Sequence, residues 1–119
     1  MANGKKSGKK ANVTRRNNLA RRRGRNFEWR VARHLDGVPW PGQDGDVEAQ
    51  GWRIECKYTA RWKYVHRLPD WIAQAQGYAK KWPEGKKWAL AITGGFRSGV
   101  YYVVPEEFFK EMIGVDNGT

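Results

Sequence analysis

The sequence has few cysteines and histidines and no long apolar run. Its single cysteine, Cys56, excludes an internal disulfide framework, and His34 and His66 add too little for a Cys/His cluster that could form a structural zinc site. No window approaches the roughly 20 apolar residues of a membrane-spanning helix. The N-terminus lacks the apolar segment of a secretory signal. We therefore expect a soluble protein of a reducing, cytoplasmic compartment with no membrane partner.

Acidic residues are absent from one end of the chain. The 119 residues include 23 Lys and Arg but 12 Asp and Glu, which gives a net charge of +11. Residues 1–26 contain 10 of the basic residues and no acidic one, so the remainder is almost neutral. We predict a disordered basic arm over residues 1–17 and a single domain over residues 18–119. The arm favours nucleic acid as a partner, and the alternatives are a solvated tail or a nuclear localisation signal.

Hydrophobic periodicity predicts three helices and four strands. The helices cover residues 27–36, with Asn26 as N-cap and Gly37 at the end, then residues 68–82 and 105–113. The strands cover residues 46–49, 52–58, 87–93 and 100–104, and a Pro/Gly-rich loop covers residues 39–45. The order α-β-β-α-β-β-α indicates an α/β (α+β) fold with a central mixed sheet of about four to five strands flanked by helices.

A hairpin turn at Gln50-Gly51 sets the register of the first two strands. A two-residue turn there gives four facing pairs: Ala49 with Trp52, Glu48 with Arg53, Val47 with Ile54, and Asp46 with Glu55. The first three pairs are apolar or opposite in charge, so this register is chemically consistent. The fourth pair brings two carboxylates together, which destabilises a sheet unless a cation lies between them.

Asp46 and Glu55 are therefore candidate ligands of a divalent cation, since Mg²⁺ binds carboxylates together with water and phosphate oxygens. Lys57 lies two residues beyond Glu55 on the same strand face, roughly 6.6 Å along the strand, where its ammonium can meet a phosphate or a water. In the alternative interpretation the three side chains line the solvated face of a hairpin, and Lys57 only neutralises the acids.

These motifs resemble those of the PD-(D/E)XK nuclease superfamily, and within it the small Holliday junction resolvases of archaea and their phage-encoded relatives. The resemblance covers roughly residues 20–104 and rests on Asn26-Phe27-Glu28, Gly45-Asp46-Val47 and Ile54-Glu55-Cys56-Lys57. It implies a restriction-endonuclease-like core and a Mg²⁺ site, with Mn²⁺ as a substitute. By resemblance the metal ligands are Glu28, Asp46, Glu55 and the main-chain carbonyl of Cys56, and Lys57 positions or activates the attacking water. The sequence departs from the family in having Gly45 where the superfamily's name has proline, and in having no serine in the loop before Asp46.

The resemblance also implies a function. We expect a Mg²⁺-dependent, structure-selective endodeoxyribonuclease, above all a Holliday junction resolvase that makes paired symmetric nicks in four-way DNA junctions during recombination and repair. Two nicks require two catalytic sets, so we expect a homodimer, with the Trp-bearing faces of the second helix and the last strands as candidate interfaces. The expected source is a prokaryotic, archaeal or phage-infected cell. The alternatives are another nuclease of the superfamily, with nicking, restriction-like or repair activity, and a non-catalytic basic nucleic-acid-binding protein.

Basic residues before the first helix and in the segment 58–67 are candidate DNA contacts, because cations bind phosphates and interleaved rings stack on exposed bases. They are Arg15, Arg16, Arg21, Arg22, Arg23, Arg25, Arg61, Lys63 and Arg67. Core packing is the alternative role of the rings. Gln74 and Tyr78 match a Q-x-x-x-Y motif found in some branches of the superfamily, which makes Gln74 a candidate accessory residue, with ordinary helix packing as the alternative.

Overall fold

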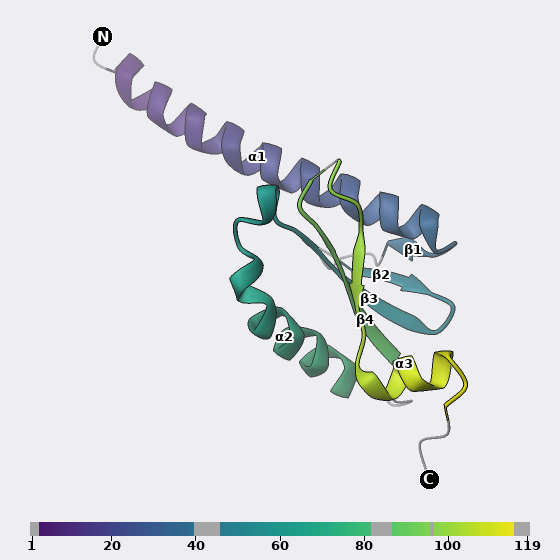
Figure 1. Ribbon diagram of the computed structural model, residues 1–119. Coiled ribbons are helices and arrows are strands. Elements are labelled where there is room, and N and C mark those ends of the chain that lie inside the picture. The colour runs from purple at the N-terminus through teal and green to yellow at the C-terminus, as the bar shows by residue number, and fades with distance from the viewer. Residues whose placement is uncertain (1–2, 40–45, 82–86, 96, 116–119) are drawn as a thin grey trace.

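The computed structural model describes residues 3–39, 46–81, 87–95 and 97–115, and for residues 3–14, 16, 17 and 46 it describes the backbone alone. These residues form an α/β fold of three helices and one mixed sheet of five strands (Figure 1). The elements in chain order are α1 (Asn3–His34), β1 (Val38–Pro39), β2 (Asp46–Ala49), β3 (Trp52–Tyr58), α2 (Leu68–Lys80), β4 (Lys87–Thr93), β5 (Tyr101–Val103) and α3 (Glu106–Met112). Two short 3-10 turns, η1 (Ala60–Trp62) and η2 (Val65–Arg67), connect β3 to α2. The predicted α/β class and mixed sheet are confirmed.

The strand order is β1-β2-β3-β4-β5, with β3 and β4 parallel and the other neighbouring pairs antiparallel. The backbones of β2 and β3 pair with Asp46 opposite Glu55 and Ala49 opposite Trp52, which confirms the predicted hairpin register. The predicted order lacks β1, because this strand has only two residues and its Pro39 is typical of a loop. Proline is tolerated there because β1 is an edge strand of the sheet.

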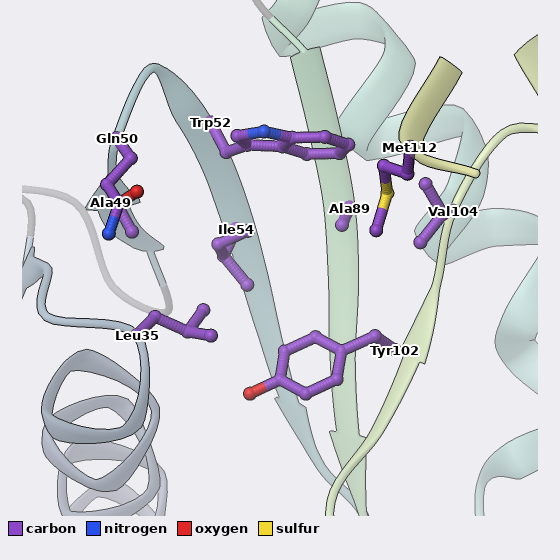
Figure 2. Close-up of a pocket in the computed structure, with 9 residues that line it drawn as sticks. All are labelled: Leu35, Ala49, Gln50, Trp52, Ile54, Ala89, Tyr102, Val104 and Met112. Atoms are coloured by element: carbon purple, nitrogen blue, oxygen red, sulfur yellow. The ribbon is translucent and has the colours of Figure 1, made fainter. Parts of the chain in front are cut away.

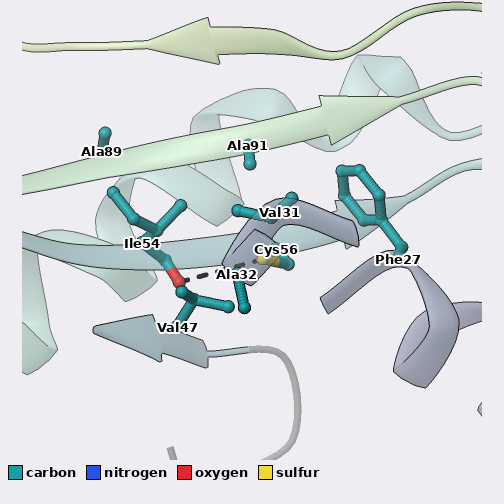
Figure 3. Packing of buried hydrophobic residues seen from close by; sticks show 8 residues of the cluster. All are labelled: Phe27, Val31, Ala32, Val47, Ile54, Cys56, Ala89 and Ala91. Carbon is teal, nitrogen blue, oxygen red and sulfur yellow. Dashed lines mark hydrogen bonds between the residues drawn. The ribbon is translucent and has the colours of Figure 1, made fainter. Parts of the chain in front are cut away.

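Helices cover the sheet on both faces (Figure 1). On one face, α1 packs on alternate residues of the central strands in a buried cluster (Figure 3). Its members are Phe27, Val31, Ala32, Val47, Ile54, Cys56, Ala89 and Ala91. On the other face, α2 packs on β4 in a second cluster of Trp71, Ala75, Trp88, Leu90 and Ile92. β4 is apolar toward both helices, whereas β3 is apolar only toward α1 and turns its polar residues toward α2.

The first helix differs from its predicted form. It begins at Asn3, so Asn26 is an interior residue of α1 and not its N-cap, and the prediction of the helix start is wrong. The backbone of residues 3–17 is helical where the sequence predicts disorder. The physical reason is that the segment just before Phe27 is rich in Arg, which has high helix propensity, and contains no proline that would stop the helix. The separation of a basic arm from the domain stays a prediction.

Helix α1 ends in a tight turn against the sheet. The Gly37 N–H donates a 2.8 Å hydrogen bond to the carbonyl of Ala32, and Asp36 adopts the left-handed conformation with a φ of 51°. These are features of the Schellman motif, in which Asp is an accepted substitute for glycine at the left-handed position. Gly37 is needed for a different reason: a Cβ at this position would collide with the backbone carbonyl oxygen of Glu48.

Replacing Gly37 with alanine is expected to destabilise the protein by about 1–3 kcal/mol, because the backbone of β2 must move to accommodate the methyl group. Urea denaturation measures this change. Gly77→Ala is the matched control, since Gly77 lies inside α2 and a Cβ added there would meet no atom within 4 Å beyond the adjacent residues and backbone of its own helix. The free energy of unfolding of the control should rise by about 0.5–1 kcal/mol, because alanine has a higher helix propensity than glycine. Equal effects of the two substitutions would contradict the close approach of α1 to β2.

The remaining predicted boundaries agree with the structure to within one or two residues where the structure describes them. Trp82, predicted at the end of the second helix, and the loop over residues 40–45 lie outside the described residues. Within the described ranges, no helix combines the length and the apolar character needed to cross a bilayer.

Candidate active site

Strand β3 presents three charged side chains to the α2 layer: Arg53, Glu55 and Lys57. Glu55 is only 3% exposed. Glu55 is therefore not on a solvated face, because β3 lies in the middle of the sheet beneath a helix. The alternative in which Lys57 only neutralises the acid stays open, since the two side chains form an ion pair. A carboxylate is seldom buried without compensating charge or hydrogen bonds, and Lys57 supplies such a charge.

Lys57 joins the buried carboxylate to α2. Its Nζ lies 3.5 Å from Glu55 Oε1 and donates a 2.9 Å hydrogen bond to Gln74 Oε1. The Lys57 side chain is 21% exposed, so its ammonium lies where the buried centre meets solvent. The structure thus brings together three of the residues singled out in the sequence, Glu55, Lys57 and Gln74.

Helix α2 explains why Gln74 reaches Lys57. Trp71 and Ala75 are buried against β4, which turns the flank carrying Gln74 and Tyr78 toward β3. The guanidinium of Arg53 lies 4.4 Å from the centre of the Tyr78 ring. Gln74 and Tyr78 of the Q-x-x-x-Y motif therefore contact Lys57 and Arg53, which lie on the same face of β3 on either side of Glu55. The contact of Gln74 is polar, and helix packing alone does not require it.

Asp46 enters the site through its backbone. It begins β2 and is paired with Glu55, and directly opposed residues of an antiparallel ladder have Cβ atoms about 4.5–5.5 Å apart. Its side chain lies outside the described part of the structure. The pairing alone places Asp46 and Glu55 on the same face of the sheet.

Glu28 and the Cys56 side chain lie on the α1 side of the sheet, opposite the layer of α2. The Cys56 side chain is buried toward α1, so it points away from Glu55. The role of the Cys56 main-chain carbonyl as a metal ligand stays a prediction. Glu28 is half-buried on α1. The adjacent Phe27 contacts the Tyr58 ring edge-on, with centroids 6.5 Å apart, so this turn of α1 lies at the carboxyl end of β3. Among side chains that the structure describes, no three Asp, Glu, His or Cys residues gather as a metal-binding group.

The predicted DNA contacts fall into three groups. Arg15, Arg21, Arg22 and Arg25 are exposed along α1, and the side chain of Arg16 lies outside the described part. In the connection from β3 to α2, Lys63 and Arg67 are exposed; the Nζ of Lys63 lies 5.4 Å from the centre of the Tyr64 ring and Arg67 is 4.0 Å from Asp70. Arg23 and Arg61 instead line one groove, together with two residues that sequence reasoning missed, Arg30 and Arg33. A signal was present, because positions 23, 30 and 33 recur with helical periodicity on one flank of α1.

A separate apolar cavity of about 390 Å³ lies on the α1 side of the sheet, toward β5 and α3 (Figure 2). Trp52, Tyr102 and Met112 are among its lining residues. Burial, and next the neighbouring Cys56 thiol, raise the pKa of the Tyr102 hydroxyl above its usual 10.0, whereas Arg30 lowers it. The cavity holds no charged lining residue among those described and is distinct from the cluster around Glu55.

Comparisons of the chain with protein-family models, with curated protein sequences and with solved structures find no match. The chain's own residues and geometry therefore carry the assignment of a function.

Proposed function

We propose that this protein is a Mg²⁺-dependent endodeoxyribonuclease with a restriction-endonuclease-like core, and that its substrate is a four-way DNA junction. The observation that carries the proposal is the contact of the Lys57 ammonium with buried Glu55 and with Gln74, at the position where the ladder pairs Asp46 with Glu55. The resemblance of the sequence motifs to PD-(D/E)XK nucleases supports the same conclusion independently of the side-chain contacts.

The residues fit a divalent cation. Paired carboxylates are costly in a sheet by themselves, and carboxylate oxygens are the protein ligands that Mg²⁺ prefers. Asp46 and Glu55 would hold the ion, with Glu28 and the Cys56 carbonyl as further ligands by resemblance. When bound, Mg²⁺ would polarise the phosphodiester and favour attack by water. Mn²⁺ is the expected substitute.

Lys57 contributes a positively charged hydrogen-bond donor to the proposed site. An ammonium has three N–H donors. In the described part of the chain, Glu55 and Gln74 are its two partners, which leaves a donor for a phosphate oxygen or for the attacking water. Two fixed contacts hold the ammonium at one position, so its charge is already in place where negative charge develops on the phosphate.

Four-way junctions are the proposed substrate because the catalytic cluster accompanies a long basic helix. Helix α1 extends well beyond the sheet (Figure 1) and carries exposed arginines that can contact the phosphates of a DNA arm without reading bases. Paired nicks require two copies of the site, so we propose a homodimer. The Trp-bearing face of α2 is not available as its interface, because Trp71 packs on the sheet, whereas Tyr101 on the edge strand β5 is 60% exposed.

Cleavage of a labelled synthetic four-way junction, compared with linear duplex of the same sequence, tests the proposal. We expect paired symmetric nicks in the junction that require Mg²⁺ and stop in EDTA. Equal cutting of linear duplex would indicate a different nuclease of the same type. Binding without any cutting would identify a non-catalytic nucleic-acid-binding protein and overturn the proposal.

Gln74 is a positioning residue for Lys57 under this proposal, so Gln74→Ala is expected to lower kcat about tenfold with little change in KM. Gln76→Ala is the matched control, since Gln76 is an exposed residue of the same helix two positions further along. Equal activity in the two variants would remove Gln74 from the site.

A further inference from the structure

A groove lined by four arginines lies on the α1 face of the sheet, opposite the side chains of Glu55 and Lys57. Helix α1 forms one wall with Arg23, Arg30 and Arg33. Arg61 and the carboxyl ends of β3 and β4 form the other wall, including Tyr58. The cavity is about 660 Å³. Its described lining contains no Asp or Glu, so the positive charges converge on one space with no carboxylate among the lining residues.

This concentration of charge predicts an anionic ligand. Four arginines along one groove make its electrostatic potential positive, which favours an anion there. Arginine also suits phosphate in particular, because its planar guanidinium donates two parallel N–H bonds to phosphate oxygens. The crevice at the carboxyl ends of parallel strands is a common position for ligands in open α/β sheets.

The wall opposite α1 is built around an unusual backbone. Arg61 has a φ of 54° and the following Trp62 a φ of 60°, and such left-handed conformations are costly for residues other than glycine. Hydrogen bonds hold them in place: the Arg61 N–H donates to the Gly94 carbonyl at 2.7 Å, and the Trp62 N–H donates to the Thr59 carbonyl at 2.8 Å. The chain thus maintains a strained turn at the point where Arg61 joins the groove.

The spacing of the arginines suits a strand rather than a single phosphate. At 1.5 Å per residue, Arg23 and Arg33 are about 15 Å apart along α1. Successive phosphates of one DNA strand are separated by roughly 3.4 Å along the helix axis, so the stripe spans several of them. Tyr58 adds a ring that can pack on a sugar or a base.

We infer that the groove between α1 and the ends of β3 and β4 binds the sugar–phosphate backbone of a DNA strand a few nucleotides from the phosphate that is cut. The identity of the strand rests on the proposed function; the anion-binding character of the groove does not. Tyr58 follows Lys57 directly in β3, and their side chains lie on opposite faces. By strand rise the groove residue Tyr58 is about 10 Å from Glu55, which is far enough to hold a flanking part of the same strand.

The test measures binding alone, by fluorescence anisotropy of a labelled four-way junction in EDTA over a series of salt concentrations. We expect the double variant Arg30→Ala/Arg33→Ala to bind at least about tenfold more weakly. The slope of the logarithm of the binding constant against the logarithm of the salt concentration should become shallower by about two. Arg30→Lys/Arg33→Lys should keep most of the slope, since the charges remain. The matched control is Lys80→Ala/Lys81→Ala, which removes the same charge at the exposed end of α2.

Loss of binding that is equal in the groove and control variants would show a general charge effect and overturn the inference, as would unchanged binding of the groove variant. Circular dichroism checks that the variant folds; if it does not, Arg33→Ala alone, at an exposed position, should lower the slope by about one. If the wild type binds through the groove but never cuts with Mg²⁺, the proposed function fails while the groove stands. If the wild type cuts and the groove variant binds normally, the inference about the groove is overturned and the proposed function stands.

Discussion

Glu55→Gln is expected to lower Mg²⁺-dependent cleavage of a four-way junction by about a hundred- to a thousandfold, which is the usual cost of losing one preorganised electrostatic group. Glutamine has nearly the same shape but no charge. It therefore removes both a carboxylate ligand and the ion pair that holds Lys57, whose Nζ lies 3.5 Å from Glu55 Oε1. Initial rates of nicking at saturating substrate measure the effect.

Glu48→Gln is the control for this prediction. Glu48 lies in the same hairpin, opposite Arg53, and is on the same face as Asp46. The control should cleave within about threefold of wild type, because its charge is not part of the proposed site. If both variants lost cleavage activity to a similar extent, the cause would be the charge or stability of the hairpin and not the loss of a catalytic carboxylate. Full activity of Glu55→Gln would exclude Glu55 from catalysis.

Leu90→Ala is expected to destabilise the protein by about 2–5 kcal/mol, the usual range for a fully buried leucine. Leu90 has 0% exposure and packs with Trp71 and Ala75 beneath α2. It also lies beside Glu55 in the parallel β3–β4 pairing, so the cavity would open next to the candidate site. Urea denaturation at equilibrium measures the change.

Ile113→Ala is the comparison for Leu90, because Ile113 is 59% exposed. Its substitution should change the free energy of unfolding by no more than about 0.5 kcal/mol. If Leu90→Ala were equally mild, the packing of α2 on β4 would be wrong, and with it the position of Gln74 beside Lys57.

Local chemistry made part of this structure predictable from sequence. The turn at Gln50-Gly51 fixes which residues of β2 and β3 face each other, so the pairing of Asp46 with Glu55 followed from two adjacent strands and their charges. The other helices and strands, apart from β1 and the start of α1, followed from hydrophobic periodicity in the same way, because each pattern is contained within one segment of the chain.

Contacts between distant segments were less predictable. Gln74 meets Lys57 only because α2 docks on the sheet through Trp71 and Ala75, and a weak motif could nominate Gln74 without giving its partner. To predict the groove of arginines, one would have needed to know that α1 passes the carboxyl ends of β3 and β4. The start of α1 was mispredicted because Asn26 resembles a cap, although cap preference alone does not stop a helix that good helix formers extend.

The proposed function requires that Asp46 and Glu55 hold a divalent cation between their strands. The most direct measurement is the free energy of unfolding of the wild type and of Asp46→Asn, each in EDTA and in Mg²⁺. Without metal, Asp46→Asn should be more stable than the wild type by about 0.2–1 kcal/mol, because a like-charge pair is removed. Mg²⁺ at about a hundred times its Kd should stabilise the wild type by about 2.7 kcal/mol and the variant far less. A variant that is less stable without metal, or that gains as much from Mg²⁺ as the wild type, would contradict a cation site between Asp46 and Glu55.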